Sequence, residues 1–260
     1  MGVFPAPVLQ ALVTAHPGVT FNDAGPVLDA IKLVKSEAEI ALLRQAARIS
    51  DDGMRAGMSE VAAGVMEVEV AAAAEYAIRR AGAELSFATV MGAGRRTADA
   101  TFFPRRRRMR AGEYVVLDCG ARVEGYHGDM CRTVVVGPPS AEQRRVLEAV
   151  EQCVHAATDA ARPGATVRDV HEAARRTVTE AGFGDHWWGY YMPHGAGTGQ
   201  HELPAGLDDA DLVLVPGMVM CIEPGVALPG VGGVILEQMV ATGETGAETL
   251  NALPLDLWDR

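Results

Sequence analysis

The chain has 260 residues, 48% of them hydrophobic, which is enough to bury the core of one large domain or two small ones. Its 34 acidic and 23 basic side chains give a formal net charge of -11, which argues against partners such as nucleic acid or an anionic membrane. No apolar run is long enough to span a bilayer, no leader pattern opens the chain, and the four cysteines lack CxxC spacing. We therefore expect a soluble cytoplasmic protein without disulfides.

The first 35 residues have little periodicity, and Gly25 and Pro26 are typical of a loop. A sharp boundary follows, because Ser36 opens a capping-box pattern. We expect residues 1–35 to be a short N-terminal segment and residues 36–260 to form the catalytic domain.

Helices and strands alternate in blocks along the rest of the chain. Four helices are predicted: from Ser36 through Met54, from Glu67 to Ala81, from Ser140 to Ala161 and from Thr166 to Ala181. Six strands are predicted: Leu85–Val90, Glu113–Asp118, Ala121–Tyr126, Met130–Val136, Met218–Glu223 and Val234–Ala241. This order predicts an α+β chain of two similar halves, each with two helices on an antiparallel sheet.

Four acidic residues end or interrupt predicted strands. Asp118 and Asp129 lie eleven residues apart across a glycine-containing turn, and Glu223 and Glu237 lie fourteen apart across another. If each pair of segments forms a hairpin, both carboxylates of a pair emerge on one face near one end. Carboxylates in apolar strands are costly unless they are paired or bind a cation. The matched pairs indicate a metal site, although a turn role remains open for each residue alone.

Two histidines lie between the acidic pairs, in the segment PHGAGTGQHELP. His194 and His201 flank glycines that allow the backbone to approach a ligand closely. One imidazole with four carboxylates suits manganese, cobalt, iron or zinc in a two-metal site better than a structural zinc. Such a site predicts a metal-bridging hydroxide as nucleophile, because two cations lower the pKa of a shared water.

From about Lys32 onward, the chain resembles the pita-bread metallopeptidases, which include aminopeptidase P, prolidase, methionine aminopeptidase and the non-peptidase creatinase. Five stretches carry the resemblance: LVKSEAEI, VVLDCGARVEGYHGDMCRT, PHGAGTGQHELP, GMVMCIEPGV and GGVILEQ. It is strongest toward the Xaa-Pro group. It implies two pseudo-symmetric halves with helices packed on a curved antiparallel sheet, and a homodimer.

The resemblance also implies roles for the residues singled out above. Five metal ligands are implied: Asp118 for one ion, His194 and Glu223 for the other, and Asp129 and Glu237 bridging both. Glu223 would also carry the proton from the water to the leaving amine. His201 would hydrogen-bond the scissile carbonyl and the developing oxyanion.

The sequence departs from the family pattern at three points. Family peptidases carry a further histidine before the first metal aspartate, but Ala98–Pro104 contains none, and His127 is not at the family's position. Gln238 stands where prolidase-like members usually have an acidic residue. The large N-terminal domain of prolidase is reduced to a remnant of about 35 residues. A lost acid/base group costs about 10²–10⁴ in rate, so the first departure favours a weak peptidase or a shifted reaction.

Aromatic, basic and histidine residues raise further alternatives. The aromatic candidates for a substrate pocket are Trp187, Trp188, Tyr190, Tyr191, Phe102 and Phe103, with a core or dimer contact as the other interpretation. The run Arg105–Arg110 is either a solvated turn or the source of an arginine that holds a substrate carboxylate. We expect the remaining histidines on the surface or on helices: His16, His155, His171 and His186.

These features together predict a dinuclear metallohydrolase. The first hypothesis is an Xaa-Pro-type aminopeptidase or dipeptidase acting on small peptides. The alternative is a hydrolase or lyase of a small non-peptide metabolite on the same scaffold, which the absent histidine and the aromatic cluster favour. A catalytically inactive binding protein is a third possibility, and the complete set of five ligands argues against it.

Overall fold

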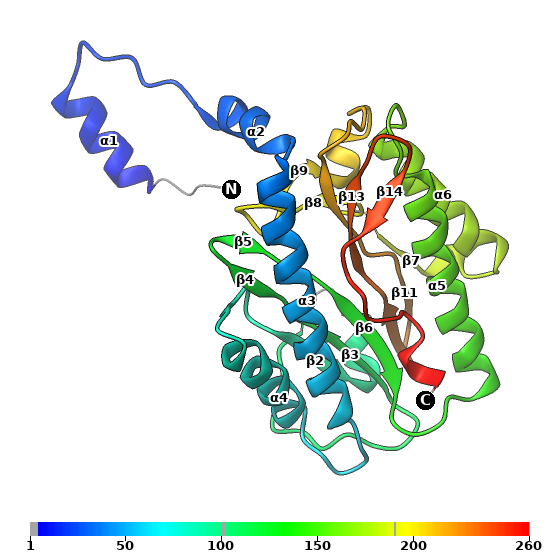
Figure 1. The fold of residues 1–260 in the computed structure, drawn as a ribbon. Coiled ribbons are helices and arrows are strands. Elements are labelled where there is room, and N and C mark those ends of the chain that lie inside the picture. The colour runs from blue at the N-terminus through cyan, green and yellow to red at the C-terminus, as the bar shows by residue number, and fades with distance from the viewer. Residues whose placement is uncertain (1–4, 100–101, 190, 260) are drawn as a thin grey trace.

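The computed structural model describes residues 5–99, 102–189 and 191–259 (Figure 1). Its six α-helices within these ranges are α1 (Ala6–Ala15), α2 (Gly25–Leu33), α3 (Glu37–Ser59), α4 (Glu67–Arg80), α5 (Ala141–Ala160) and α6 (Val167–Glu180). The first strands are β1 (Glu84–Leu85), β2 (Val90–Ala93), β3 (Tyr114–Asp118), β4 (Ala121–Val123), β5 (Tyr126–His127) and β6 (Cys131–Val135). The later strands are β7 (Trp187–Trp188), β8 (His194–Gly195), β9 (Glu202–Ala205), β10 (Val219–Ile222), β11 (Gly225–Leu228), β12 (Gly232–Ile235), β13 (Gln238–Thr242) and β14 (Ala247–Thr249).

Two helix pairs enclose the strands, with α3 and α4 on one side and α5 and α6 on the other (Figure 1). One core packs α3 and α4 against β3, and a second packs α5 and α6 against β10. The strands form antiparallel sheets, including β2-β3-β6 and the five-stranded β14-β13-β10-β8-β9. This is the predicted α+β architecture of two halves with helices on antiparallel sheets.

The two halves repeat each other closely. Helices α4 and α6 each have 14 residues and start at Glu67 and Val167, 100 residues apart. Glycines with positive φ flank both helices: Gly64 (90°) and Gly164 (85°) precede them, and Gly82 (85°) and Gly182 (87°) follow them. The start of each helix is hydrogen-bonded to a distant backbone segment, residues 105–109 for α4 and residues 210–214 for α6. Because these segments lead into β3 and β10, the two strands are structural equivalents.

The capping patterns form as predicted. Ser36 and Glu39 exchange both bonds of a capping box at the start of α3, and Ser140 with Gln143 does the same for α5. Thr166 forms the equivalent box at α6. Local sequence therefore determines where these helices begin.

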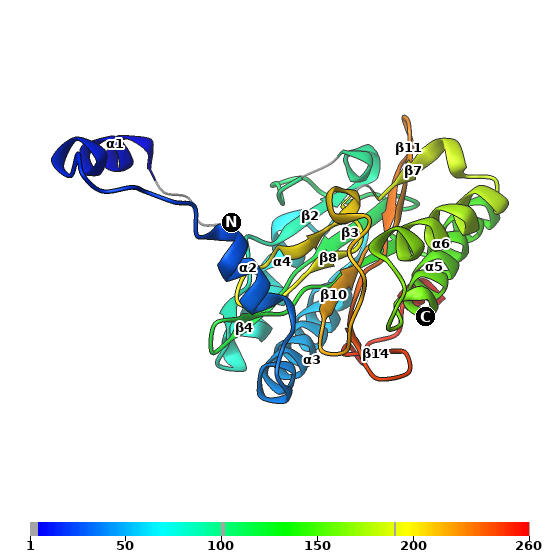
Figure 2. The same ribbon diagram turned by 90° about the horizontal axis from the view of Figure 1, so that it is seen from above.

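The prediction of a loop over the first 35 residues is wrong, because α1 and α2 lie there. Pro26 stands in the first turn of α2, where its missing N–H leaves no hydrogen bond unmade. Neither helix has a buried residue, and α1 stands away from the rest of the molecule in both views (Figures 1 and 2).

Several strand predictions need correction. Leu85–Val90 is not one strand, since β1 ends at Leu85 and β2 begins at Val90. Ala121–Tyr126 divides into β4 and β5 at a turn in which Glu124 and Gly125 both have positive φ. Val234–Ala241 divides into β12 and β13 on either side of Glu237, whose N–H bonds the carbonyl of Cys131 at 2.9 Å instead of continuing a strand.

Candidate metal centre

Strand pairing brings each pair of acidic residues together. In the β3–β6 pair Asp118 lies opposite Cys131, so Asp129 sits just beyond the start of β6. In the β10–β13 pair Ile222 lies opposite Gln238. Glu223 directly follows β10 and Glu237 directly precedes β13, so the two lie side by side at the same end of the pair. Both predicted pairings of segments are confirmed.

His194 joins these carboxylates from the neighbouring strand. It lies opposite Cys221 in the β8–β10 pair. Its Nε2 is 3.6 Å from Oε1 of Glu223 and 3.7 Å from Oε1 of Glu237. One donor atom from each of Asp129, His194, Glu237 and Cys221 lies within 4.8 Å of the others. Residues more than 100 positions apart in sequence therefore meet in one cluster.

The cluster is buried and rich in negative charge. Asp129, His194 and Glu237 are 3%, 2% and 1% exposed. Burial raises the pKa of Asp118 to about 7, and burial with the charge of Asp118 nearby raises the pKa of Glu223 to about 7. Burial and neighbouring carboxylates raise the pKa of Asp129 and Glu237 well above their usual values.

The donor set fits divalent cations. Among the described residues, Oδ1 of Asp118 is buried without a hydrogen-bond partner. An unpaired buried carboxylate oxygen costs free energy that a cation would recover. Four carboxylates and one imidazole are hard or intermediate donors, which suit manganese, iron, cobalt or zinc.

His201 lies directly on His194. The two rings are stacked with centroids 4.0 Å apart and planes inclined by 23°. Partial burial, with His194 adjacent, lowers the pKa of His201 to about 4, so its imidazole is neutral at neutral pH. A neutral imidazole beside the carboxylates can donate one hydrogen bond to a substrate oxygen.

Cys221 is a cluster member that sequence reasoning missed. Cys221 lacks the CxxC spacing that is typical of cysteine metal sites. The available signal was alternation: Cys221 lies two residues before Glu223 and therefore on the same face of the strand. Burial, followed by the carboxylates of Glu237 and Asp129, raises the pKa of its thiol well above the usual range.

A cavity of about 650 Å³ opens over the cluster. Of the predicted aromatic residues, Trp187, Trp188, Tyr191 and Phe102 line it, and Tyr190 lies outside the described residues. Phe103 is not among the described lining residues and is 54% exposed, so its assignment to the pocket is wrong. Neighbouring side chains in an extended segment point to opposite sides, and Phe102 takes the inward position.

Two other histidines differ in their relation to the cavity. His171 lies on α6 as expected, but its ring is 2% exposed and lines the cavity. Its Nδ1 is 3.1 Å from the carbonyl oxygen of Met192, and its ring meets Trp187 edge-on at 5.5 Å. His127 does not belong to the described cavity lining, and its Nδ1 lies 2.8 Å from Oγ of Ser86. His127 therefore does not replace the missing family histidine.

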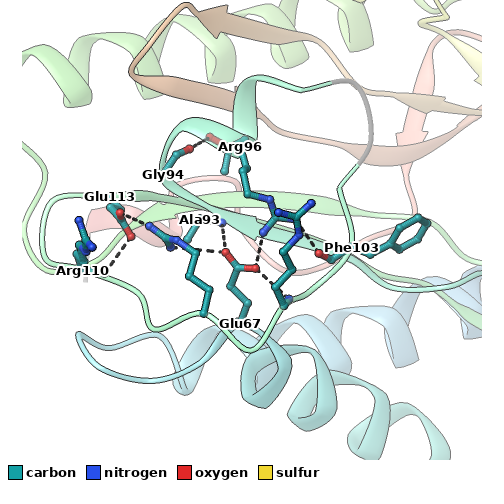
Figure 3. Close-up of polar contacts among 10 residues, drawn as sticks. Glu67, Ala93, Gly94, Arg96, Phe103, Arg110 and Glu113 are labelled. Carbon is teal, nitrogen blue, oxygen red and sulfur yellow. Dashed lines mark hydrogen bonds and ion pairs between the residues drawn. The ribbon is translucent and has the colours of Figure 1, made fainter.

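The arginine run contacts a buried carboxylate that lies outside the cavity. Glu67 is fully buried and accepts bonds from Arg96 Nη1 (2.5 Å), the Ala93 N–H (3.1 Å) and the Arg105 N–H (3.0 Å) (Figure 3). Arg107 lies 3.6 Å from the same carboxylate.

The arginine run makes further contacts in the same region. Arg107 also bonds Glu113, which in turn accepts the Arg110 N–H at 2.9 Å, and Arg108 bonds the carbonyl of Gly64 at 2.7 Å. No described lining residue comes from Arg105–Arg110, so the structure does not support substrate capture by this run.

Comparison with known proteins gives consistent results. The model of metallopeptidase family M24 matches residues 41–244. An Xaa-Pro dipeptidase of Pyrococcus furiosus is 35% identical over 238 residues, covering 91% of this chain and 68% of that protein. A putative dipeptidase of Bacillus subtilis is 33% identical over 249 residues, covering 95% of this chain and 68% of that protein.

The fold agrees with the same group. The crystal structure of the prolidase from Pyrococcus horikoshii matches with a TM-score of 0.93 at 32% identity, covering 98% of this chain and 73% of that one. Within the described part of the chain, no helix has the length and apolar character needed to cross a membrane.

Proposed function

The chain belongs to metallopeptidase family M24, and from this premise we propose that it is a metal-dependent Xaa-Pro dipeptidase. The observation that carries the proposal is the buried convergence of Asp129, His194 and Glu237 beside Glu223, beneath a cavity with an aromatic wall. Its relatives named for Xaa-Pro dipeptidase activity favour a peptide substrate over the non-peptide alternative.

Five residues would hold two divalent ions, of which manganese, cobalt, iron and zinc all fit the donors. Asp118, Asp129, His194, Glu223 and Glu237 would hold these ions between them. When bound, such ions lower the pKa of water and polarise a carbonyl.

The side chains of the cavity would supply positioning and proton transfer. Glu223 would take a proton from the attacking water and deliver it to the leaving amine. His201, neutral and stacked on His194, would donate a hydrogen bond to the scissile carbonyl oxygen as negative charge develops. Trp187 and Trp188 would contact the proline ring.

We further propose that residues 36–260 form the catalytic unit and residues 1–35 a short N-terminal segment, that the protein is a homodimer, and that it is cytoplasmic. The family match within residues 41–244 supports the first boundary. Exposed apolar side chains on α2, such as Val27 (63%) and Ile31 (70%), support self-association, and four free buried cysteines suit a reducing compartment. Light scattering of the purified protein would test the dimer.

The activity is tested by metal analysis and a peptide panel. We expect bound divalent metal and cleavage of Xaa-Pro dipeptides in preference to Met-peptides. Asp129→Ala is expected to lose both metal and activity. Metal binding without turnover of any peptide in the panel would contradict the function, and full activity in Asp129→Ala would contradict the site.

A further inference from the structure

The cavity carries one cationic side chain that the proposed mechanism does not use. Besides acidic, aromatic and histidine residues, the described lining includes Arg175, and no other arginine or lysine of the described chain lines it. The two divalent ions of the proposed function would offset the charge of the four carboxylates at the other end of the cavity. Arg175 is then the cationic side chain of the described lining that remains to attract the negative end of a substrate.

Helix α6 determines where this arginine lies. His171 and Arg175 are four residues apart and therefore share one face of the helix. His171 is held by the carbonyl of Met192 at 3.1 Å and by the edge of Trp187. These contacts fix this face of α6 against the cavity wall, and Arg175 extends from it one turn later.

The guanidinium of Arg175 has only a weak tie to the protein. Within the described part of the chain it forms an ion pair with Glu172, 3.6 Å away, and the two side chains are 59% and 50% exposed. Exposed pairs of this kind contribute little to stability. A substrate carboxylate can therefore displace Glu172, because a planar guanidinium binds carboxylate through two parallel hydrogen bonds.

We propose that Arg175 binds the free α-carboxylate of the substrate and so selects dipeptides over longer peptides. In a longer peptide the same position holds an uncharged amide, which cannot form a charge-assisted pair. This inference rests on the proposed function, since it names the end of the Xaa-Pro substrate that the cavity recognises.

Steady-state kinetics with Ala-Pro and with its C-terminal amide test the proposal. Arg175→Ala should raise KM for Ala-Pro by about 10- to 100-fold, the loss of a hydrogen-bonded charged pair, and leave KM for the amide unchanged. Arg175→Lys should recover part of the affinity for Ala-Pro, because an ammonium keeps the charge without the two-bond geometry. Arg176→Ala is the matched control, since Arg176 is the adjacent exposed arginine and is not among the described lining residues; its KM should not change.

A binding experiment separates this inference from the proposed function. Tryptophan fluorescence, reported by Trp187 and Trp188, measures binding of proline and prolinamide without turnover. The wild type should bind proline more tightly, and Arg175→Ala should lose that preference even if no peptide is cleaved. Three outcomes would each overturn the inference. The first is that Arg175→Ala weakens binding of the acid and the amide equally, and the second is that Arg176→Ala has the same effect as Arg175→Ala. The third is that the wild type shows no preference for proline over prolinamide.

Discussion

Lys35 and Glu202 form a buried ion pair that links the start of α3 to the loop of His201. Their Nζ and Oε2 atoms are 3.3 Å apart, and the side chains are 2% and 3% exposed. The other oxygen of Glu202 accepts the Gly199 N–H at 2.7 Å and the Lys32 ammonium at 3.1 Å. The residue next to His201 is therefore anchored from outside the cavity.

Breaking the Lys35–Glu202 pair should destabilise the protein far more than removing the more exposed Lys32 does. Lys35→Met leaves Glu202 buried with one cation fewer, so we expect the free energy of unfolding to fall by about 3–5 kcal/mol. Lys32→Met removes a cation that is 34% exposed on the same carboxylate, and should cost less than about 1 kcal/mol. Urea denaturation of the two variants measures the difference, and equal losses would contradict the role given to Lys35.

The raised pKa values of the cluster predict how stability of the metal-free protein depends on pH. Asp118 and Glu223 have folded pKa values of about 7, above the ordinary 3.8 and 4.5, so the folded state retains protons that the unfolded chain has released. Their stabilising contribution is complete below about pH 4 and is lost as pH rises through 7.

We therefore expect the Tm of the chelated protein to fall from pH 5 to pH 8. The free energy of unfolding should fall by up to about 1.4 kcal/mol per pH unit for each group. Asp118→Asn should reduce this dependence, because an amide does not titrate, and Glu223 should retain its share. Calorimetry across this range is the measurement. A Tm that rises with pH in the chelated wild type would show that the sign is wrong.

At the scale of elements, the segment between β2 and β3 is held by the first turn of α4. Glu67 bonds Arg96, and Arg96 also bonds the carbonyl of Phe103 at 2.7 Å, next to the cavity residue Phe102. The carbonyl of Phe102 accepts the Met91 N–H at 3.2 Å. A carboxylate outside the cavity thus positions part of its wall.

Glu67→Gln should loosen this segment. It leaves Arg96 without its charged partner, whereas Arg107 keeps Glu113, so we expect a loss of about 3–5 kcal/mol and a raised KM for Xaa-Pro peptides. Glu69→Gln is the control on the same turn, because Glu69 is exposed and a glutamine can keep its bond to the Met66 N–H. Thermal melts and steady-state kinetics compare the two, and a similar stability in both variants would refute the structural role of Glu67.

At the scale of the whole molecule, the metal centre lies where the two halves meet. Asp118 and Asp129 come from the first half, whereas His194, Glu223 and Glu237 come from the second. Ions held by both sets would bind only when the halves are packed together. Metal binding is therefore linked to global stability.

Removing metal should accordingly lower the Tm of the whole domain. A site filled at 100 times its Kd adds about 2.7 kcal/mol. Asp129→Asn should lose most of this increment while its chelated form melts near the chelated wild type. Calorimetry with and without chelator provides both values. A metal-dependent gain that survives in Asp129→Asn would place the ions elsewhere.

The sequence by itself determined the features that depend on neighbours along the chain. Capping patterns such as Ser36 with Glu39 located helix starts, because the bonds form within one turn. Matched acidic pairs and a histidine indicated the site, because antiparallel pairing returns residues such as Asp118 and Asp129 to one end. The loop predicted around Pro26 failed because proline is compatible with both a loop and the first turn of a helix.

Only the tertiary structure decided which side chains face the cavity. His171 and Arg175 became lining residues because α6 packs with one face toward Trp187. The run Arg105–Arg110 lies outside the described lining, and its Arg107 side chain contacts the buried Glu67 instead. Cys221 entered the cluster through pairing of β10 with β8. Secondary structure follows from interactions over a few residues, whereas the orientation of a helix and the partner of a buried charge follow from packing between segments far apart in the chain. That packing is why His171 and Arg175 could not be assigned to the cavity from local pattern, although the aromatic residues Trp187 and Trp188 could.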